Sequence, residues 1–164
     1  TAAVEVADKF LMQGGIVSTR GRSAQEDFNY QAHYGGTWRV PLVVLIDGDS
    51  ASASEIFAGA IKDNGRGDVV GERSFGKGSV QGIFPLGYAG AGVRLTTALF
   101  YSPLNRKISK QGVEPTVNVV TAARPVGGYA GLSNQTELTG DDDDPILEAG
   151  LEAARRQVAA RTSR

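Results

Sequence analysis

The sequence predicts an α/β fold in which helices flank a mixed β-sheet, and residues 43–81 carry most of that prediction. Residues 42–46 form an uninterrupted apolar run that is rich in β-branched side chains and is stopped by an Asp-Gly pair. Such a run is typical of a strand buried on both faces. A helical pattern follows, and a second short apolar run at Val69 and Val70 predicts the next strand. This order of strand, helix and strand is typical of α/β proteins.

The helix between these strands has a recognisable start and end. Ser52 is followed three residues later by Glu55, which is the spacing of a capping box. The residues that follow keep one apolar face at helical spacing, and Gly65 ends the helix. Backbone N–H groups at a helix N-terminus favour developing negative charge, so the turn at Ser52 is a candidate reactive site.

The composition limits the chemistry that the 164 residues can carry. A formal net charge of −1 gives no basic field for nucleic acid, and the absence of cysteine removes disulfides, thiol nucleophiles and thiolate metal sites. The single histidine, His33, lies among polar residues and needs no catalytic role there. No apolar run approaches the roughly 20 residues that a membrane span needs. The chain begins at Thr1 inside a predicted helix, so we interpret it as part of a longer protein.

Hydrophobic patterns of helical or alternating period predict the other elements of the first 120 residues. In chain order they are a helix at residues 1–12, strands at 16–19 and 28–32, a hairpin of strands 79–84 and 93–101, and an extended segment at 113–120. Pro115 restricts the last segment to the edge of a sheet, because proline cannot donate a ladder hydrogen bond.

The C-terminal part is predicted to be a flexible segment followed by a helix. Residues 121–140 are rich in Gly, Ala and Thr, which is typical of a linker. Four Asp then precede Pro145, and this arrangement indicates a helix N-terminus, an interpretation that we prefer to cation binding. Residues 141–164 are therefore interpreted as the C-terminal helix. Its predicted apolar face consists of Leu147, Leu151, Ala154 and Val158.

Ser52, Lys77 and Gln81 are the candidate catalytic side chains. A serine hydroxyl needs a base to take its proton, and without a suitable histidine, lysine is the remaining common base. Free lysine has a pKa of about 10.4, so a lysine base must be shielded from water or lie beside groups that lower its pKa. The glycines that flank Lys77 could let it point inward, and the neutral amide of Gln81 could orient the amine without adding charge. Two simpler interpretations stay open: Ser52 as a helix cap only, and Lys77 as a surface lysine only.

A phosphate-binding loop is a rival interpretation of the same glycines. Gly71, Gly76 and Lys77 have the required spacing, but Gly78 stands where such a loop needs the Ser or Thr that binds Mg²⁺. The residues that follow also predict a strand, whereas a phosphate-binding loop opens a helix.

Asp63 could be proposed as a third catalytic residue. On a regular helix it lies about 16 Å along the axis from Ser52, which is too far for contact. We therefore interpret Asp63 as possible structural support near the end of the helix, pairing with Arg66 or Arg73.

A set of motifs runs through most of the chain. They are Ser50-Ala51-Ser52-Ala53-Ser54-Glu55, Ala58-Gly59-Ala60, Asp63, Arg66, Gly71-Glu72, Phe75-Gly76-Lys77-Gly78 and Gln81, then Gly112-Val113-Glu114-Pro115 and Asp144-Pro145-Ile146-Leu147. Together they resemble the C-terminal processing peptidases, also called tail-specific proteases. The resemblance covers nearly the whole chain and implies a serine endopeptidase with a crotonase/ClpP-like α/β core.

The resemblance also implies roles for single residues. Ser52 would be the nucleophile of an acyl-enzyme mechanism, Lys77 the general base, and Gln81 the residue that positions the lysine. The backbone N–H of Ala53 would be one oxyanion donor, and some descriptions of the family add the aspartate that matches Asp63. The implied substrate is a polypeptide cleaved near its C-terminus, with no cofactor or metal. The family suggests the cell envelope or periplasm, and it implies no particular oligomeric state.

Residues 1–120 would then be part of the catalytic core. Family members carry a PDZ domain and an Asp-Leu-Arg-x-Asn-x-Gly-Gly segment ahead of this region, and a backbone N–H of that segment completes the oxyanion hole. The sequence contains neither, and losing one oxyanion donor costs about 10²–10³ in turnover, so we expect this chain to be weak or inactive alone. The alternative is a non-catalytic binding module of the same fold for apolar or peptide ligands. Such a module has no reason to keep Ser52, Lys77 and Gln81 together.

Overall fold

The computed structural model describes residues 2–33, 35, 37–88, 90–121 and 144–162. The helices are α1 (Ala2–Asp8), α2 (Ala53–Asp63) and α3 (Pro145–Thr162), with a short 3-10 helix at Ala24–Glu26. The strands are β1 (Gly15–Gly21), β2 (Asn29–Gln31), β3 (Val43–Ile46), β4 (Asp68–Gly71), β5 (Ser79–Pro85), β6 (Gly92–Tyr101) and β7 (Val117–Asn118). The predicted α/β class is confirmed. Most of the predicted flexible segment, residues 122–140, lies outside the described residues.

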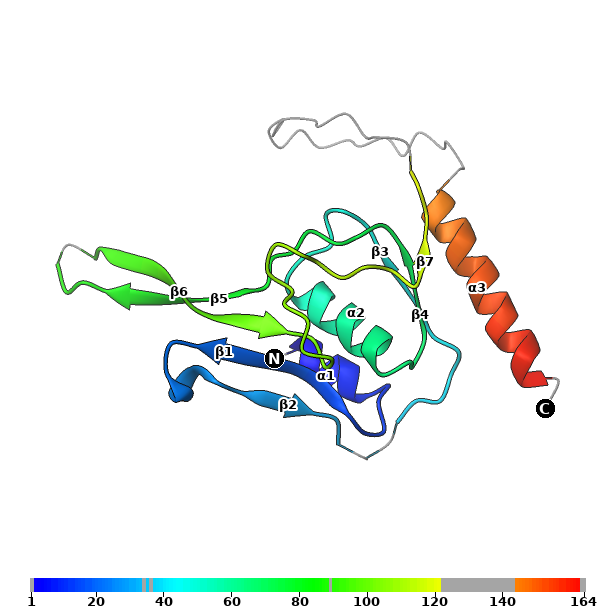
Figure 1. The fold of residues 1–164 in the computed structure, drawn as a ribbon, viewed down its shortest axis with the longest axis horizontal. Helices are drawn as coiled ribbons and strands as arrows, with labels where there is room; N and C mark the ends of the chain where they lie inside the picture. Colours follow the sequence, from blue (N-terminus) through cyan, green and yellow to red (C-terminus); the bar gives the residue numbers. More distant parts are fainter. Residues whose placement is uncertain (1, 34, 36, 89, 122–143, 163–164) are drawn as a thin grey trace.

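The strands of the described part form two sheets (Figure 1). One is antiparallel in the order β2-β1-β6-β5, and the other is parallel in the order β3-β4-β7. The predicted hairpin is confirmed as β5 and β6, which project from the rest of the fold. Strand β7 follows Pro115 and lies at the edge of its sheet, as the proline predicts.

Helix α2 is the central element of the fold. It contacts α1, strand β1 of the antiparallel sheet and strand β4 of the parallel sheet (Figure 1). Its predicted apolar face is confirmed at Ile56, Ala60 and Ile61, which are buried, but Ala53 at the start of that face is exposed. The prediction that the strand before it is buried on both faces is wrong at Leu45, which is 42% exposed in β3. Whatever α2 carries at its first turn is therefore held on a well-packed support.

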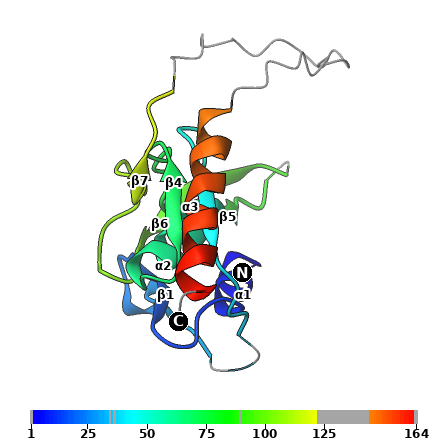
Figure 2. The same cartoon turned by 90° about the vertical axis from the view of Figure 1, so that its right-hand side faces the viewer.

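Helix α3 begins where the sequence predicts. Asp144 Oδ1 accepts the backbone N–H groups of Ile146 and Leu147, both at 3.0 Å, and so caps the helix ahead of Pro145. The helix lies against β3 and β4, on the side of the molecule that faces the viewer in Figure 2. No helix in the described part of the chain has the length and apolar composition of a membrane span.

The predicted apolar face of α3 is wrong. Three of its four residues point to solvent: Leu147 is 47%, Leu151 48% and Val158 52% exposed. The inward face instead includes the small residues Gly150 and Ala153 and the polar Gln157, with Ile146 beside Gly71 at its start. A Cβ added at Gly150 would lie 2.5 Å from Leu45 Cδ2, so glycine lets the helix approach β3 closely. Gln157 bonds both backbone groups of Leu42, at 3.0 and 3.1 Å, which fixes the helix to the start of β3.

Gly59, in the middle of α2, provides a test of how α2 packs against the segments that carry Ser102 and Val113. A Cβ added there would meet Val113 Cγ2 at 3.7 Å and Ser102 Cβ at 3.8 Å, which are ordinary van der Waals distances. Glycine inside a helix costs about 0.5–1 kcal/mol relative to alanine, so Gly59→Ala is expected to raise the free energy of unfolding by about that amount. Chemical denaturation measures the change. Gly78→Ala is the matched comparison and should destabilise, because its Cβ would lie 2.3 Å from Ser109 N. Destabilisation by Gly59→Ala would contradict the packing described.

Candidate active site

Ser52 lies in the turn that joins β3 to α2. The strand ends at Ile46 and the helix begins at Ala53. Asp47 builds the turn, because its Oδ1 accepts hydrogen bonds from the backbone N–H and from the hydroxyl of Ser50, both at 2.8 Å. Ser52 therefore sits beyond the carboxyl end of a parallel strand, at the first turn of the central helix.

Ser52 has a backbone conformation that residues with side chains rarely adopt. Its φ is 58° and its ψ is −112°, and a sparsely populated conformation of this kind costs about 1–3 kcal/mol. A strained strand-to-helix turn that carries a serine is also the local geometry of the nucleophile elbow in α/β hydrolases. The next backbone N–H, that of Ala53, has no hydrogen-bond partner in the described part of the chain and is free to donate.

Glu55 joins the turn of Ser52 to the loop of Lys77. It is fully buried, and its two carboxylate oxygens accept four hydrogen bonds. Oε1 binds the hydroxyl of Ser74 at 2.6 Å and the N–H of Gly76 at 2.7 Å. Oε2 binds the N–H groups of Ser52 and Lys77, both at 2.8 Å. The capping-box spacing predicts only the bond to Ser52. Nothing in the local pattern indicates the three partners that lie 19 to 22 residues further along the chain.

This shared carboxylate brings two of the predicted catalytic residues together. Since one oxygen lies 2.8 Å from the backbone nitrogens of both Ser52 and Lys77, those nitrogens are at most twice that distance, 5.6 Å, apart. A second link lies beside it, where Phe75 N–H donates to Ser50 O at 3.0 Å. The two loops are therefore fixed to each other through main-chain atoms, independently of the Lys77 side chain.

The glycines around Lys77 allow a sharp turn and a close approach of the chain, but they do not turn the lysine inward. Gly76 has φ of 90°, a left-handed conformation that glycine adopts most easily. A Cβ at Gly78 would lie 2.3 Å from Ser109 N, so the segment that follows β6 passes close behind the loop. The expectation that these glycines shield Lys77 from water is wrong for this chain, because Lys77 is exposed.

Gln81 forms no hydrogen bond with Ser52 or Lys77 in the part of the chain that the structure describes. It lies in β5 opposite Thr96, beside an irregularity in the pairing with β6. Gln81 is exposed, and its side chain has no hydrogen-bond partner within the described ranges.

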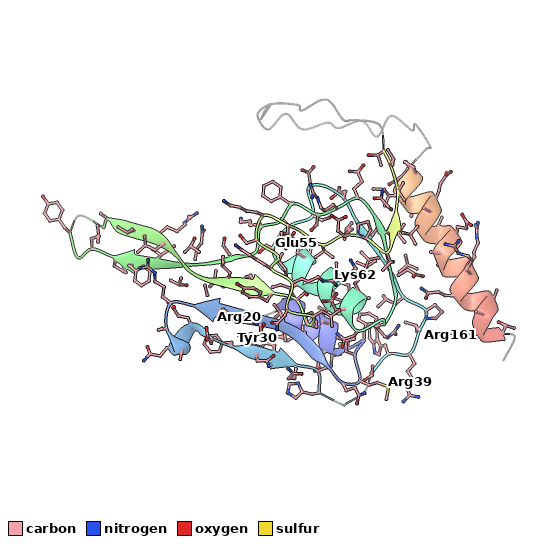
Figure 3. All side chains as sticks on the ribbon, in the orientation of Figure 1. Arg20, Tyr30, Arg39, Glu55, Lys62 and Arg161 are labelled. Carbon is pink, nitrogen blue, oxygen red and sulfur yellow. The ribbon has the colours of Figure 1, made fainter. Side chains whose placement is uncertain are left out.

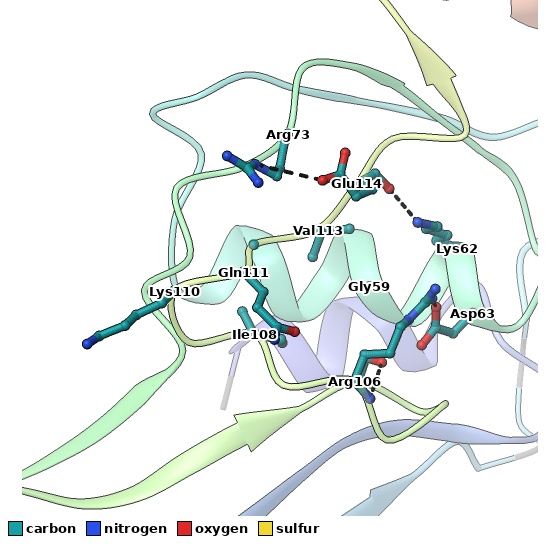
Figure 4. Close-up of a pocket in the computed structure, with 12 residues that line it drawn as sticks. Gly59, Lys62, Asp63, Arg73, Arg106, Ile108, Lys110, Gln111, Val113 and Glu114 are labelled. Carbon is teal, nitrogen blue, oxygen red and sulfur yellow. Dashed lines mark hydrogen bonds and ion pairs between the residues drawn. The ribbon is translucent and has the colours of Figure 1, made fainter.

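Asp63 lies at the far end of α2 from Ser52. Its side chain is fully buried and pairs with Arg106 (Figure 4). Its Oδ2 accepts the N–H of Leu104 at 3.1 Å. The predicted partners are therefore wrong: Arg66 binds backbone carbonyls, and the nearest carboxylate to Arg73 is that of Glu114, at 3.8 Å. Asp63 ties the chain after β6 to the end of α2.

Lys62, the neighbour of Asp63, lines the pocket drawn in Figure 4. Its Nζ donates to Glu114 O at 2.6 Å. Burial, and then the charge of Arg106, lower the pKa of the Lys62 amine, while Glu114 opposes them. These charged groups lie around the C-terminal half of α2, at the opposite end of the helix from Ser52.

The other candidates from the sequence are His33 and a phosphate-binding loop, and the structure supports neither as part of this site. His33 is on the surface, with its Nδ1 3.6 Å from Asp8 Oδ2 and its side chain 84% exposed. The phosphate-loop interpretation is wrong, because the residues after Lys77 form strand β5 and not a helix. Within the described ranges, no three His, Asp or Glu side chains gather as a metal site would require.

The chain is similar to proteins of one known family. A model of peptidase family S41 matches residues 1–119. A carboxy-terminal-processing protease of Bartonella bacilliformis is 48% identical over 141 residues, and a carboxyl-terminal-processing protease of Picosynechococcus is 42% identical over 137 residues. Each match covers 84% of this chain and 32% of the relative.

The solved structure of a photosystem II D1 C-terminal processing protease is similar to this one, with a TM-score of 0.65 and 39% identity. The match covers 72% of this chain and 30% of that protein, so the chain spans about a third of the length of the relatives it matches. Because the family model covers well over half of its residues, the chain belongs to peptidase family S41.

Proposed function

We propose that this chain forms the part of a C-terminal processing serine peptidase that carries the nucleophile and the base. Ser52 attacks the scissile carbonyl, and Lys77 takes its proton and passes it to the leaving amine. The resulting acyl-enzyme is then hydrolysed by water. The N–H of Ala53 donates to the oxyanion, and Gln81 orients the lysine when substrate is bound. Membership of the family supports the peptidase class.

The observation that carries the assignment of residues is the buried carboxylate of Glu55. A hydroxyl and its base must be held in register to react efficiently, and a small displacement can cost about 10²-fold in rate. Glu55 sets that register through the backbone N–H groups of Ser52 and Lys77. The strained φ of Ser52 and the unpaired N–H of Ala53 support the same roles.

The exposure of Lys77 determines how its amine could act as a base. The shielding that a lysine base needs is proposed to come from the bound polypeptide and from other parts of the longer protein. The substrate would be an extended polypeptide close to its C-terminus, paired to a sheet edge. Strand β5 is such an edge and begins two residues after Lys77. Neither a cofactor nor a metal belongs to this mechanism, and the proposed location is the cell envelope or periplasm.

Covalent labelling of the longer protein with a serine-directed fluorophosphonate tests the proposal. Ser52 is expected to be the labelled residue, identified by peptide mass spectrometry, because an activated hydroxyl reacts where an ordinary one does not. Ser54→Ala is the matched control, since Ser54 is exposed on the same turn of α2 and should not affect labelling. Labelling that survives Ser52→Ala would contradict the proposal. A protein that is not labelled at all but binds peptides would be the non-catalytic module instead.

A further inference from the structure

Three arginines surround a cavity at the opposite end of α2 from Ser52. The cavity has a volume of about 530 Å³ and lies between the end of α1, the loop before β3, the end of α2 and the end of α3. Arg39, Arg66 and Arg161 line it, and no Asp or Glu does so among the described residues. The helix of 11 residues separates it from Ser52 by about 16 Å, so it is distinct from the candidate active site.

Arg66 is fixed in place by the backbone. Its Nε donates to Phe10 O at 2.7 Å, and its Nη2 donates to Trp38 O at 2.6 Å and to Val40 O at 2.9 Å. The guanidinium also lies 5.9 Å from the centre of the Phe10 ring. Carbonyl oxygens orient a guanidinium but do not cancel its charge, so Arg66 presents a rigid positive group to the cavity.

Arg161 and Arg39 complete the positive wall. Arg161 Nη1 donates to Arg39 O, and the two side chains lie where the end of α3 meets the loop before β3 (Figure 3). Burial, and then the charge of Arg161, lower the pKa of the Arg66 guanidinium, so these like charges lie close enough to oppose each other. Within the described ranges none of the three arginines forms an ion pair with a carboxylate. An anion would relieve this repulsion.

We propose that this cavity binds a phosphate group carried on an organic substituent. Arg39 and Arg161 can each offer two N–H groups to phosphate oxygens in a bidentate manner. Arg66 adds its charge and the N–H groups of Nη1, because its Nε and Nη2 bind backbone carbonyls. The charge of three arginines suits a dianion better than a carboxylate. The cavity is larger than free phosphate needs, which leaves room for an ester. The exposed side chains beside it, Met12 at 40% and Trp38 at 59%, offer that substituent an apolar surface. A soluble phosphate ester and a phospholipid headgroup share this chemistry.

Two probes tell the sources apart. Phenyl phosphate, titrated at constant ionic strength and followed by calorimetry, reports a soluble ester. Sedimentation with phosphatidylglycerol vesicles, compared with phosphatidylcholine vesicles, reports a headgroup. Saturable binding of either probe is the expected result, and the probe that binds identifies the source. Binding of neither probe would overturn the proposal. The readout involves no hydrolysis, so it is independent of the proposed peptidase activity.

Arg39→Gln is the decisive variant, because Arg39 is exposed and its side chain holds no other residue, so the fold should be unaffected. It is expected to weaken binding about tenfold or more. Arg155→Gln removes the same charge from an exposed position on α3 and should change binding little. Equal losses in Arg39→Gln and Arg155→Gln would overturn the assignment.

Discussion

Replacing Lys77 by arginine in the longer protein is expected to lower kcat/KM for peptide hydrolysis by about 10³-fold or more, as much as replacing it by alanine does. Arginine keeps the positive charge and much of the length of lysine, but it does not lose its proton in proteins. A lysine that serves only as a positive charge would be replaced by arginine with little loss. A lysine that takes a proton from Ser52 cannot be replaced in this way.

The comparison of Lys77→Arg with Lys77→Ala requires that both variants fold, and the structure indicates that they do. Lys77 is exposed, and its bond to Glu55 uses the backbone N–H, which every substitution except proline retains. Lys110→Arg is the matched control, since Lys110 is also exposed on a neighbouring loop. Steady-state kinetics on a peptide substrate gives the rates, and unfolding curves of the variants check the fold. An active Lys77→Arg enzyme would remove Lys77 from the role of base.

Glu55→Gln is expected to lower the free energy of unfolding by about 3 kcal/mol or more and the hydrolysis rate by about 10²-fold. Glutamine has nearly the same shape, but its NH₂ group would replace one carboxylate oxygen. That group would then face two hydrogen donors, either the N–H groups of Ser52 and Lys77 or the groups of Ser74 and Gly76. Two buried donors lose their acceptor in either orientation, and the loops they belong to move apart.

The two effects of Glu55→Gln are measured separately, by denaturant unfolding of this chain and by kinetics of the longer protein. Glu152→Gln makes the same chemical change at an exposed ion pair on α3 and should shift stability by less than about 1 kcal/mol. If Glu55→Gln proved as mild as Glu152→Gln, Glu55 would not be the group that holds the two loops together. Loss of activity with unchanged stability would instead place its role in catalysis alone.

The sequence predicts the supporting elements of this site well because their signals are local. The apolar run before Asp47, the helical spacing after Ser52 and the glycines beside Lys77 each act within a few residues. Strand β4 and the β5–β6 hairpin are predictable for the same reason. These elements are enough to suggest Ser52 and Lys77 as partners, since strand and helix order bring the two loops to one end of the fold.

The features that the sequence predicts wrongly or not at all depend on contacts between segments that are far apart in the chain. In α3 the leucines give the stronger hydrophobic pattern, yet the small residues Gly150 and Ala153 face the sheet because they allow a closer approach. Glu55 matches the capping-box spacing, which accounts for a glutamate at this position without any other partner. The sequence therefore does not indicate its bonds to the Ser74–Lys77 loop. The cavity of the three arginines is assembled from segments that end far apart in the chain, and no spacing predicts it.

The positive φ of Ser52 means that the chain would fold more easily with glycine in place of this proposed nucleophile. Glycine adopts that geometry with little steric penalty, whereas serine holds it only because the surrounding bonds enforce it. Selection for thermal stability alone would therefore favour glycine at position 52, which has no side chain to react. Substitutions that raise the free energy of unfolding without affecting Ser52 must therefore be sought at other residues, such as Gly59. No conflict between stability and the proposed activity is expected there.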